Sequence, residues 1–135
     1  MVKSEIHRAI MDQENFKQKI HLVISVIIVV PVSFLYGFDR LSQLNIDLNT
    51  TDELNVFKGI MGLYLGLALL WLLGIFKQKY LYAALVSNTA FMLGLGVGRF
   101  FSIIIDGLPT AAFIFGTIGE LVLGFYGFWV LKRLK

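Results

Sequence analysis

The sequence predicts an all-α integral membrane protein: a four-helix bundle, antiparallel up-down-up-down, with both termini cytoplasmic. The chain is 57% hydrophobic and 16% charged, whereas soluble domains are roughly 45–50% apolar and about 25% charged. Its mean hydropathy is +0.76. The apolar residues gather into four blocks, each near or above the ~20 residues that a transmembrane helix needs. Basic residues concentrate at one end of these blocks, which sets the predicted orientation.

The first block, residues 20–38, follows a polar N-terminal segment, residues 1–19, which we expect to lie in the cytoplasm near the membrane surface. Nineteen helical residues rise about 28 Å, close to the ~30 Å hydrocarbon core. A signal peptide would have a shorter apolar region and a small-residue cleavage motif. The segment therefore predicts a retained helix that begins the transmembrane domain, residues 20–135, with a kink expected at Pro31.

The second block, residues 55–76, follows an acidic loop, residues 39–54. Thr51, Asp52 and Glu53 are typical of a helix N-terminus, because acidic side chains there favour the helix dipole. Gly62 and Gly66 form a small-xxx-small pair, which permits close approach of another helix backbone. We expect these glycines to serve helix packing.

The third block, residues 80–105, carries polar residues on one face. Asn88, Arg99, Ser102 and Asp106 project within about 60° of one another on a helical wheel. A single polar stripe on an otherwise apolar helix indicates a polar interior that faces a partner or a cavity. Gly94, Gly96 and Gly98 of this helix make room for close packing, and Gly94 and Gly98 are expected to pack against the fourth helix.

The fourth block, residues 109–131, begins with Pro109, which suits the first turn of a helix. Gly116, Glu120 and Gly124 follow one another at intervals of four residues, so they share one helix face. Glu120 is therefore expected on the small-residue face that packs against other helices, and Gly116 and Gly124 are expected to permit that packing.

The basic residues are divided unequally between the two ends of the predicted helices. Of twelve lysines and arginines, nine fall at the end that contains both termini, and three, Arg40, Lys58 and Arg99, fall on or towards the other end. The positive-inside rule then places both termini in the cytoplasm. The net charge of +3 reflects this topology, and it does not indicate a nucleic-acid surface.

The ionisable residues at membrane depth form the candidate site. Arg99 lies ~9 Å and Glu120 ~16 Å from the outer ends of their helices, and their side chains lean towards each other. An ion pair is expected, with Asp106 as a second acceptor at the outer rim and with Ser102 and Asn88 in the same polar cluster. The pair could lock two helices together, handle a ligand or proton, or bind a lipid headgroup. With no cysteine and no metal-ligand cluster, nucleophile elbow or phosphate loop in the sequence, we expect no metal site, no catalytic residues and no cofactor.

Several short motifs resemble a bacterial membrane family catalogued as domain of unknown function 4345. They are Lys58-Gly59, Gly62-Leu63-Tyr64-Leu65-Gly66, Gly98-Arg99-Phe100-Phe101-Ser102, Asp106-Gly107 and Glu120-Leu121. The similarity covers roughly residues 34–132, and the family has arginine where this chain has Lys58. The resemblance implies a four-helix protein of the bacterial inner membrane, with an arginine in helix three and a glutamate in helix four. It implies no activity.

Three functional hypotheses follow. The first is a non-enzymatic protein whose polar pocket binds a lipid or small amphiphilic ligand, or which acts as an accessory subunit of a membrane partner protein. The second is a small proton- or ion-coupled transporter or channel that works as a homo-oligomer. The third is a membrane enzyme that uses Glu120 as acid and base, which the lack of a second deep catalytic group disfavours. Membrane lipids are the partners expected in every case, and nucleic acid is not.

Overall fold

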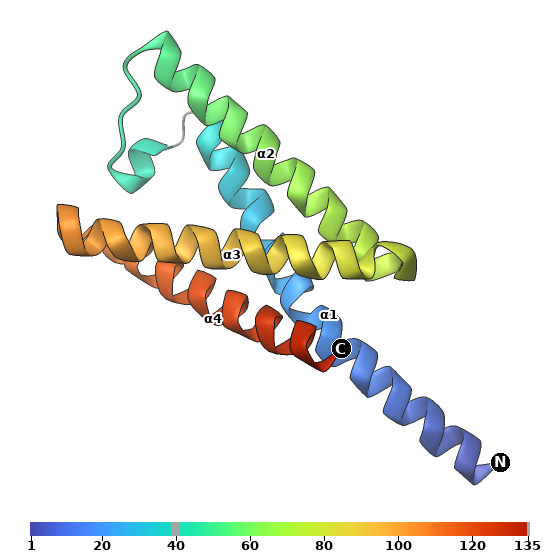
Figure 1. Ribbon diagram of the computed structural model, residues 1–135. Helices are drawn as coiled ribbons and strands as arrows, with labels where there is room; N and C mark the ends of the chain where they lie inside the picture. Colours follow the sequence, from blue (N-terminus) through green and yellow to red (C-terminus); the bar gives the residue numbers. More distant parts are fainter. Residues whose placement is uncertain (39–40, 135) are drawn as a thin grey trace.

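The computed structural model describes residues 1–38 and 41–134 and contains four long helices (Figure 1). The helices are α1 (Val2–Gly37), α2 (Thr51–Phe76), α3 (Gln78–Asp106) and α4 (Ala111–Arg133), and a short 3₁₀ helix, η1 (Leu41–Leu44), precedes α2. The predicted all-helical architecture is confirmed within the described residues. Arg40 and Lys135, which contribute to the charge asymmetry, lie outside them.

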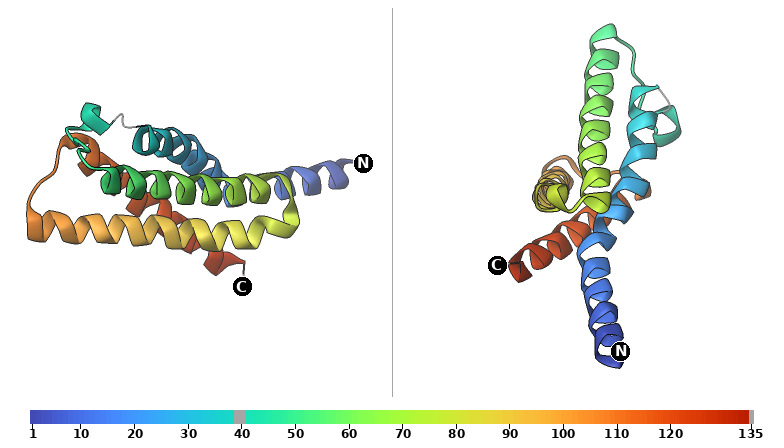
Figure 2. Two further views of the ribbon diagram at one scale, coloured as in Figure 1. Left: turned by 90° about the horizontal axis from the view of Figure 1, so that it is seen from above. Right: turned by 90° about the vertical axis from the view of Figure 1, so that its right-hand side faces the viewer.

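Helix α1 is longer than predicted, because the polar leader and the first apolar block form one continuous helix of 36 residues. At 1.5 Å per residue such a helix is about 54 Å long, well beyond the ~30 Å hydrocarbon core. Its first half projects beyond the other helices (Figures 1 and 2). The polar segment therefore continues the axis of the first apolar block.

Local sequence explains the bounds of α2. Thr50 is the N-cap, its side chain accepts a hydrogen bond from the Glu53 backbone N–H, and the Glu53 carboxylate accepts one from the Thr50 N–H, which completes a capping box. At the other end, Lys19 of α1 donates to the Ile75 carbonyl at 3.0 Å. This contact satisfies one of the carbonyls that lack a partner at a helix C-terminus.

The four helices form two antiparallel hairpins, α1–α2 and α3–α4, which are joined by packing of α2 on α3. The hairpins meet where α2 turns into α3 and diverge towards the opposite end (Figure 1). We call the end near Lys17, Lys77 and the C-terminus the terminal end, and the end near residues 107–110 the loop end. Because α1 has few contacts with α3 and α4, a space remains between the hairpins towards the loop end.

Apolar side chains cover both the interior and the outer surface of the bundle. Trp71, Leu22 and Leu85 are fully buried between the helices. Large apolar side chains such as Phe115 and Phe125 are exposed on the outside, where a soluble protein would rarely have so extensive an apolar surface. All four long helices are long and apolar enough to span a membrane.

The close packing of α3 on α4 depends on one glycine from each helix, Gly96 and Gly124. A Cβ atom added at Gly96 would lie 2.9 Å from the Leu121 side chain, and one added at Gly124 would lie 2.7 Å from the Leu93 side chain. Each glycine thus receives a leucine from the facing helix, as close helix packing in membranes requires. Gly124 lies at the contact as expected, and of the three glycines of α3 that the sequence offered for close packing, Gly96 is the one that faces α4.

The other predicted packing glycines do not make such contacts with the part of the chain that the structure describes. Added Cβ atoms at Gly62, Gly66, Gly94 and Gly98 would meet nothing within 4 Å, and at Gly116 the neighbour is the Arg99 side chain. The physical reason is rotation about the helix axis. Gly94 and Gly98 lie on either side of Gly96, so when Gly96 faces α4 they are turned roughly 160–200° away from it.

Candidate functional site

Arg99 and Glu120 form the predicted ion pair between α3 and α4. The Arg99 Nη1 atom lies 2.8 Å from Glu120 Oε1, and the two side chains are 23% and 14% exposed. A charge-assisted contact of this length is among the stronger polar interactions in proteins. The pair places one positive and one negative charge among apolar helices, where each needs a partner.

Tyr36 adds a third helix to this pair. The Arg99 Nη2 group donates a hydrogen bond to the Tyr36 hydroxyl at 3.1 Å, and Tyr36 itself is buried near the end of α1. Its ring packs against Phe57 and Tyr64 of α2 at centroid distances of 5.8 and 5.7 Å. Sequence reasoning missed Tyr36, although it is the only tyrosine in the first predicted span, residues 20–38, and lies near the loop end of that span.

Two residues of α4 shape the space around the guanidinium. A Cβ atom at Gly116 would lie 3.1 Å from Arg99 Nη1, so the missing side chain makes room for the arginine head. The Phe113 ring lies 5.6 Å from the Arg99 guanidinium carbon, a distance at which the ring face attracts a cation. Gly116 therefore accommodates a side chain of α3, which corrects its predicted role in backbone packing.

A cavity of about 250 Å³ adjoins these polar groups. It lies between the hairpins, and residues of all four long helices and of η1 line it. Most of the lining is aliphatic or aromatic, and the polar side chains are Tyr36, Tyr64, Arg99 and Glu120. Leu44 of η1 also contributes, so the segment after the first hairpin helix helps to enclose the cavity at the loop end.

The hydrogen-bonding capacity of the pair is not used up by its known partners. Glu120 Oε2 is buried and has no hydrogen-bond partner among the described residues. Arg99 has five N–H donors, and its described polar contacts are those to Glu120 and Tyr36. The cavity thus combines apolar walls with a carboxylate oxygen and guanidinium donors that a bound molecule could engage.

Three other predicted members of the polar cluster lie elsewhere. The Ser102 hydroxyl donates to Asp106 Oδ2 at 2.7 Å, both residues are exposed, and neither lines the cavity. Asn88 is fully buried but has no described contact with the pair. The helical wheel placed Asp106 and Asn88 near Arg99 in angle only, because residues seven or eleven positions apart are separated by two or three turns along the axis. Ser102 is within one turn of Arg99, but its hydroxyl donates to Asp106 instead.

The described residues contain no group of three or more histidine, cysteine, aspartate or glutamate side chains suited to a metal ion. The arrangement instead places the polar side chains of Arg99, Glu120 and Tyr36 at one side of an otherwise apolar cavity.

No curated protein and no solved structure matches the chain. The model of one protein family matches residues 17–131, which includes every residue of the cavity. The chain therefore belongs to the family described as domain of unknown function (DUF4345).

Proposed function

We propose that this protein resides in the bacterial inner membrane with both termini in the cytoplasm and binds a lipid or small amphiphile in the cavity beside Arg99 and Glu120. The observation that carries the proposal is the cavity itself: apolar walls with an Arg99–Glu120–Tyr36 cluster at one side. The orientation rests on the positive-inside rule, and it puts the cavity in the outer half of the bilayer.

The size of the cavity favours a slender ligand. Sites for small molecules usually have volumes of ~300–1,000 Å³, so 250 Å³ suits one acyl chain, or part of one, better than a whole two-chain lipid. The aliphatic and aromatic lining matches such a chain. Because α1 approaches α3 and α4 at few points, the ligand can enter sideways from the bilayer.

The charges favour a ligand with an uncharged polar head. Glu120 neutralises Arg99 at 2.8 Å, so an anionic head would bring a second negative charge next to the carboxylate. A carbonyl, ester or hydroxyl head could instead accept from the remaining guanidinium N–H groups. Its hydroxyl could donate to Glu120 Oε2, which lacks a partner in the described structure.

One observation supports a second candidate function, a proton-coupled transporter or channel that acts as a homo-oligomer. A carboxylate oxygen without a hydrogen-bond partner beside a cavity at membrane depth is a feature of proton relays. Proton flux into proteoliposomes, abolished by Glu120→Gln, would favour this candidate. An accessory role is compatible with the first proposal if the ligand helps to recruit a membrane partner protein.

Capture of the ligand tests the proposal directly. The purified protein is incubated with a photoreactive monoacylglycerol, irradiated, and digested, and the labelled peptides are identified by mass spectrometry. We expect labels on α1 and α4 segments that line the cavity. Gly119→Leu should abolish them, because Gly119 lines the cavity and a Cβ atom there meets nothing within 4 Å.

Gly62→Leu is the matched control, since Gly62 also has open space around its Cβ position but does not line the cavity. Labelling that is equally strong in wild type and Gly119→Leu would refute amphiphile binding at this site. Labelling by a photoreactive fatty acid but not by the uncharged monoacylglycerol would refute the preference for a neutral head.

A further inference from the structure

A second group of buried polar side chains lies closer to the terminal end than the cavity. It consists of His21 of α1 and Asn88 and Thr89 of α3, which are 1%, 0% and 5% exposed. Both ring nitrogens of His21, both amide atoms of Asn88 and the Thr89 hydroxyl lack hydrogen-bond partners among the described residues. These five atoms form most of the buried polar atoms without a partner in the described structure.

Gly127 of α4 shows that His21 and Thr89 converge on one point. A Cβ atom added at Gly127 would overlap Thr89 Oγ1 and lie 3.3 Å from His21 Nε2. Helices α1, α3 and α4 therefore approach one another at Gly127, where α4 carries no side chain. Asn88 precedes Thr89 on the buried face of α3, so its amide enters the same layer of the bundle.

This polar layer is distinct from the amphiphile cavity. Met92 follows Asn88 by four residues, and Leu123 precedes Gly127 by four residues, so each lies one helical turn towards the loop end. Both Met92 and Leu123 line the cavity, whereas His21, Asn88, Thr89 and Gly127 do not. Met92 and Leu123 therefore lie between the two sites. The second site does not depend on the proposed function of the first.

We propose that His21, Asn88 and Thr89 form an internal water-binding site. A buried polar atom without a hydrogen bond is costly, and water is the smallest molecule that could supply bonds to the five such atoms of this layer. The three side chains offer both donors and acceptors, as water requires, and buried waters commonly make two to four such bonds. A metal ion is disfavoured because the described residues hold no suitable cluster of ligands, and burial excludes a side chain from another protein.

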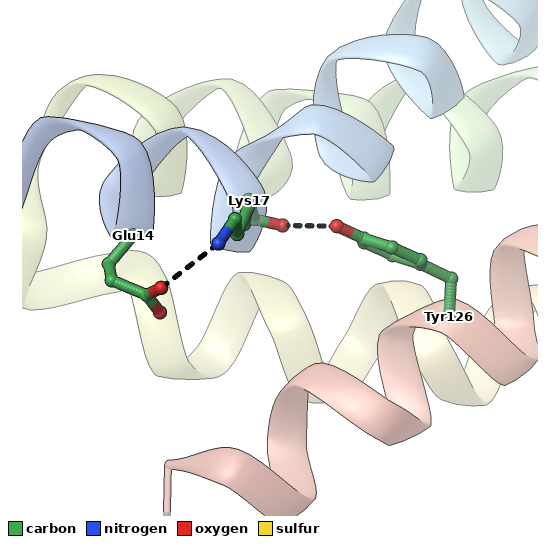
Figure 3. A network of polar contacts seen from close by, with 3 residues as sticks. All are labelled: Glu14, Lys17 and Tyr126. Atoms are coloured by element: carbon green, nitrogen blue, oxygen red, sulfur yellow. Dashed lines mark hydrogen bonds and ion pairs between the residues drawn. The ribbon is translucent and has the colours of Figure 1, made fainter. Parts of the chain in front are cut away.

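Tyr126 lies between this site and the surface at the terminal end. Its ring is 5.3 Å from the His21 ring, and its hydroxyl donates to the Lys17 carbonyl at 2.8 Å (Figure 3). Lys17 lies one turn before His21 on α1, and the contact is exposed. Water can therefore enter from the terminal end when the Tyr126 ring moves aside.

Solid-state NMR of the protein in lipid bilayers tests the proposal, because magnetisation from water reaches hydrated N–H groups first. The chain has two histidines, so His7→Gln leaves His21 as the only imidazole. The two tryptophans are internal references: Trp71 is fully buried with its indole N–H bonded to Ser87, and Trp129 is 40% exposed. We expect the His21 ring to receive water magnetisation as fast as Trp129, although it is 1% exposed.

Transfer to His21 as slow as transfer to Trp71 would overturn the proposal. Gly127→Ala adds a methyl group where the three helices meet and should abolish the fast transfer, whereas Gly98→Ala, which meets nothing within 4 Å, should preserve it. Fast transfer that survives Gly127→Ala would place the water elsewhere and also overturn the proposal.

A second measurement decides the matter if Gly127→Ala does not fold. Thr89→Val has nearly the same shape as the wild-type side chain but lacks the hydroxyl. In a hydrated site it removes a bond to water, so the unfolding midpoint should fall or stay the same. A higher midpoint would show that the hydroxyl is buried without a partner, and it would refute the water site.

Discussion

Removal of one partner from the Arg99–Glu120 pair should destabilise the protein strongly. Glu120→Gln leaves the guanidinium without the counter-ion that lies 2.8 Å away. Breaking a buried ion pair costs roughly 3–5 kcal/mol. The side chains retain 23% and 14% exposure, and Tyr36 keeps its hydrogen bond to Arg99, so we expect the lower part of that range, about 3 kcal/mol.

The double replacement Arg99→Leu with Glu120→Leu should recover much of this loss, because both charges leave the protein interior together. Thermal or denaturant unfolding of the wild type, both single leucine variants and the double variant in one detergent gives the coupling energy. We expect about 2 kcal/mol, within the range for residues in direct contact. A coupling energy near zero would refute the ion pair as a structural element and leave Arg99 and Glu120 as independently solvated groups.

Three further predictions concern topology, packing and the outer rim. A reporter fused after residue 135 should be active only in the cytoplasm, and periplasmic activity would contradict the positive-inside assignment. Gly124→Leu should reduce the folded yield, because the Leu93 side chain occupies the space of the added Cβ atom. Gly94→Leu is the control and should not reduce it, since nothing lies within 4 Å of a Cβ atom there. Equal yields of the two variants would argue against the α3–α4 contact. Asp106→Asn should change the unfolding free energy by less than ~0.5 kcal/mol, because its contact with Ser102 is exposed; a larger loss in the same denaturation assay would show an additional role.

Much of the site could be predicted from the sequence, because the position of a residue along its helix and the tilt of its side chain are both local properties. Depth along a helix follows from residue number at 1.5 Å per residue, and the tilt of side chains towards the helix N-terminus is the same in every helix. Those rules bring Arg99 and Glu120 together, as the structure confirms. They could not identify Tyr36, because a contact 63 residues away depends on where α1 crosses α3.

The sequence by itself determined that the protein has four long apolar helices and that the side chains of Arg99 and Glu120 can reach each other. Hydrophobic length and helical period are properties of each segment alone, so they survive into the folded structure unchanged. Only the tertiary structure decided which glycine of α3 faces α4, and that His21 and Thr89 converge on Gly127. The rotation of a helix about its axis is set by packing against all its neighbours at once, and no single segment encodes it.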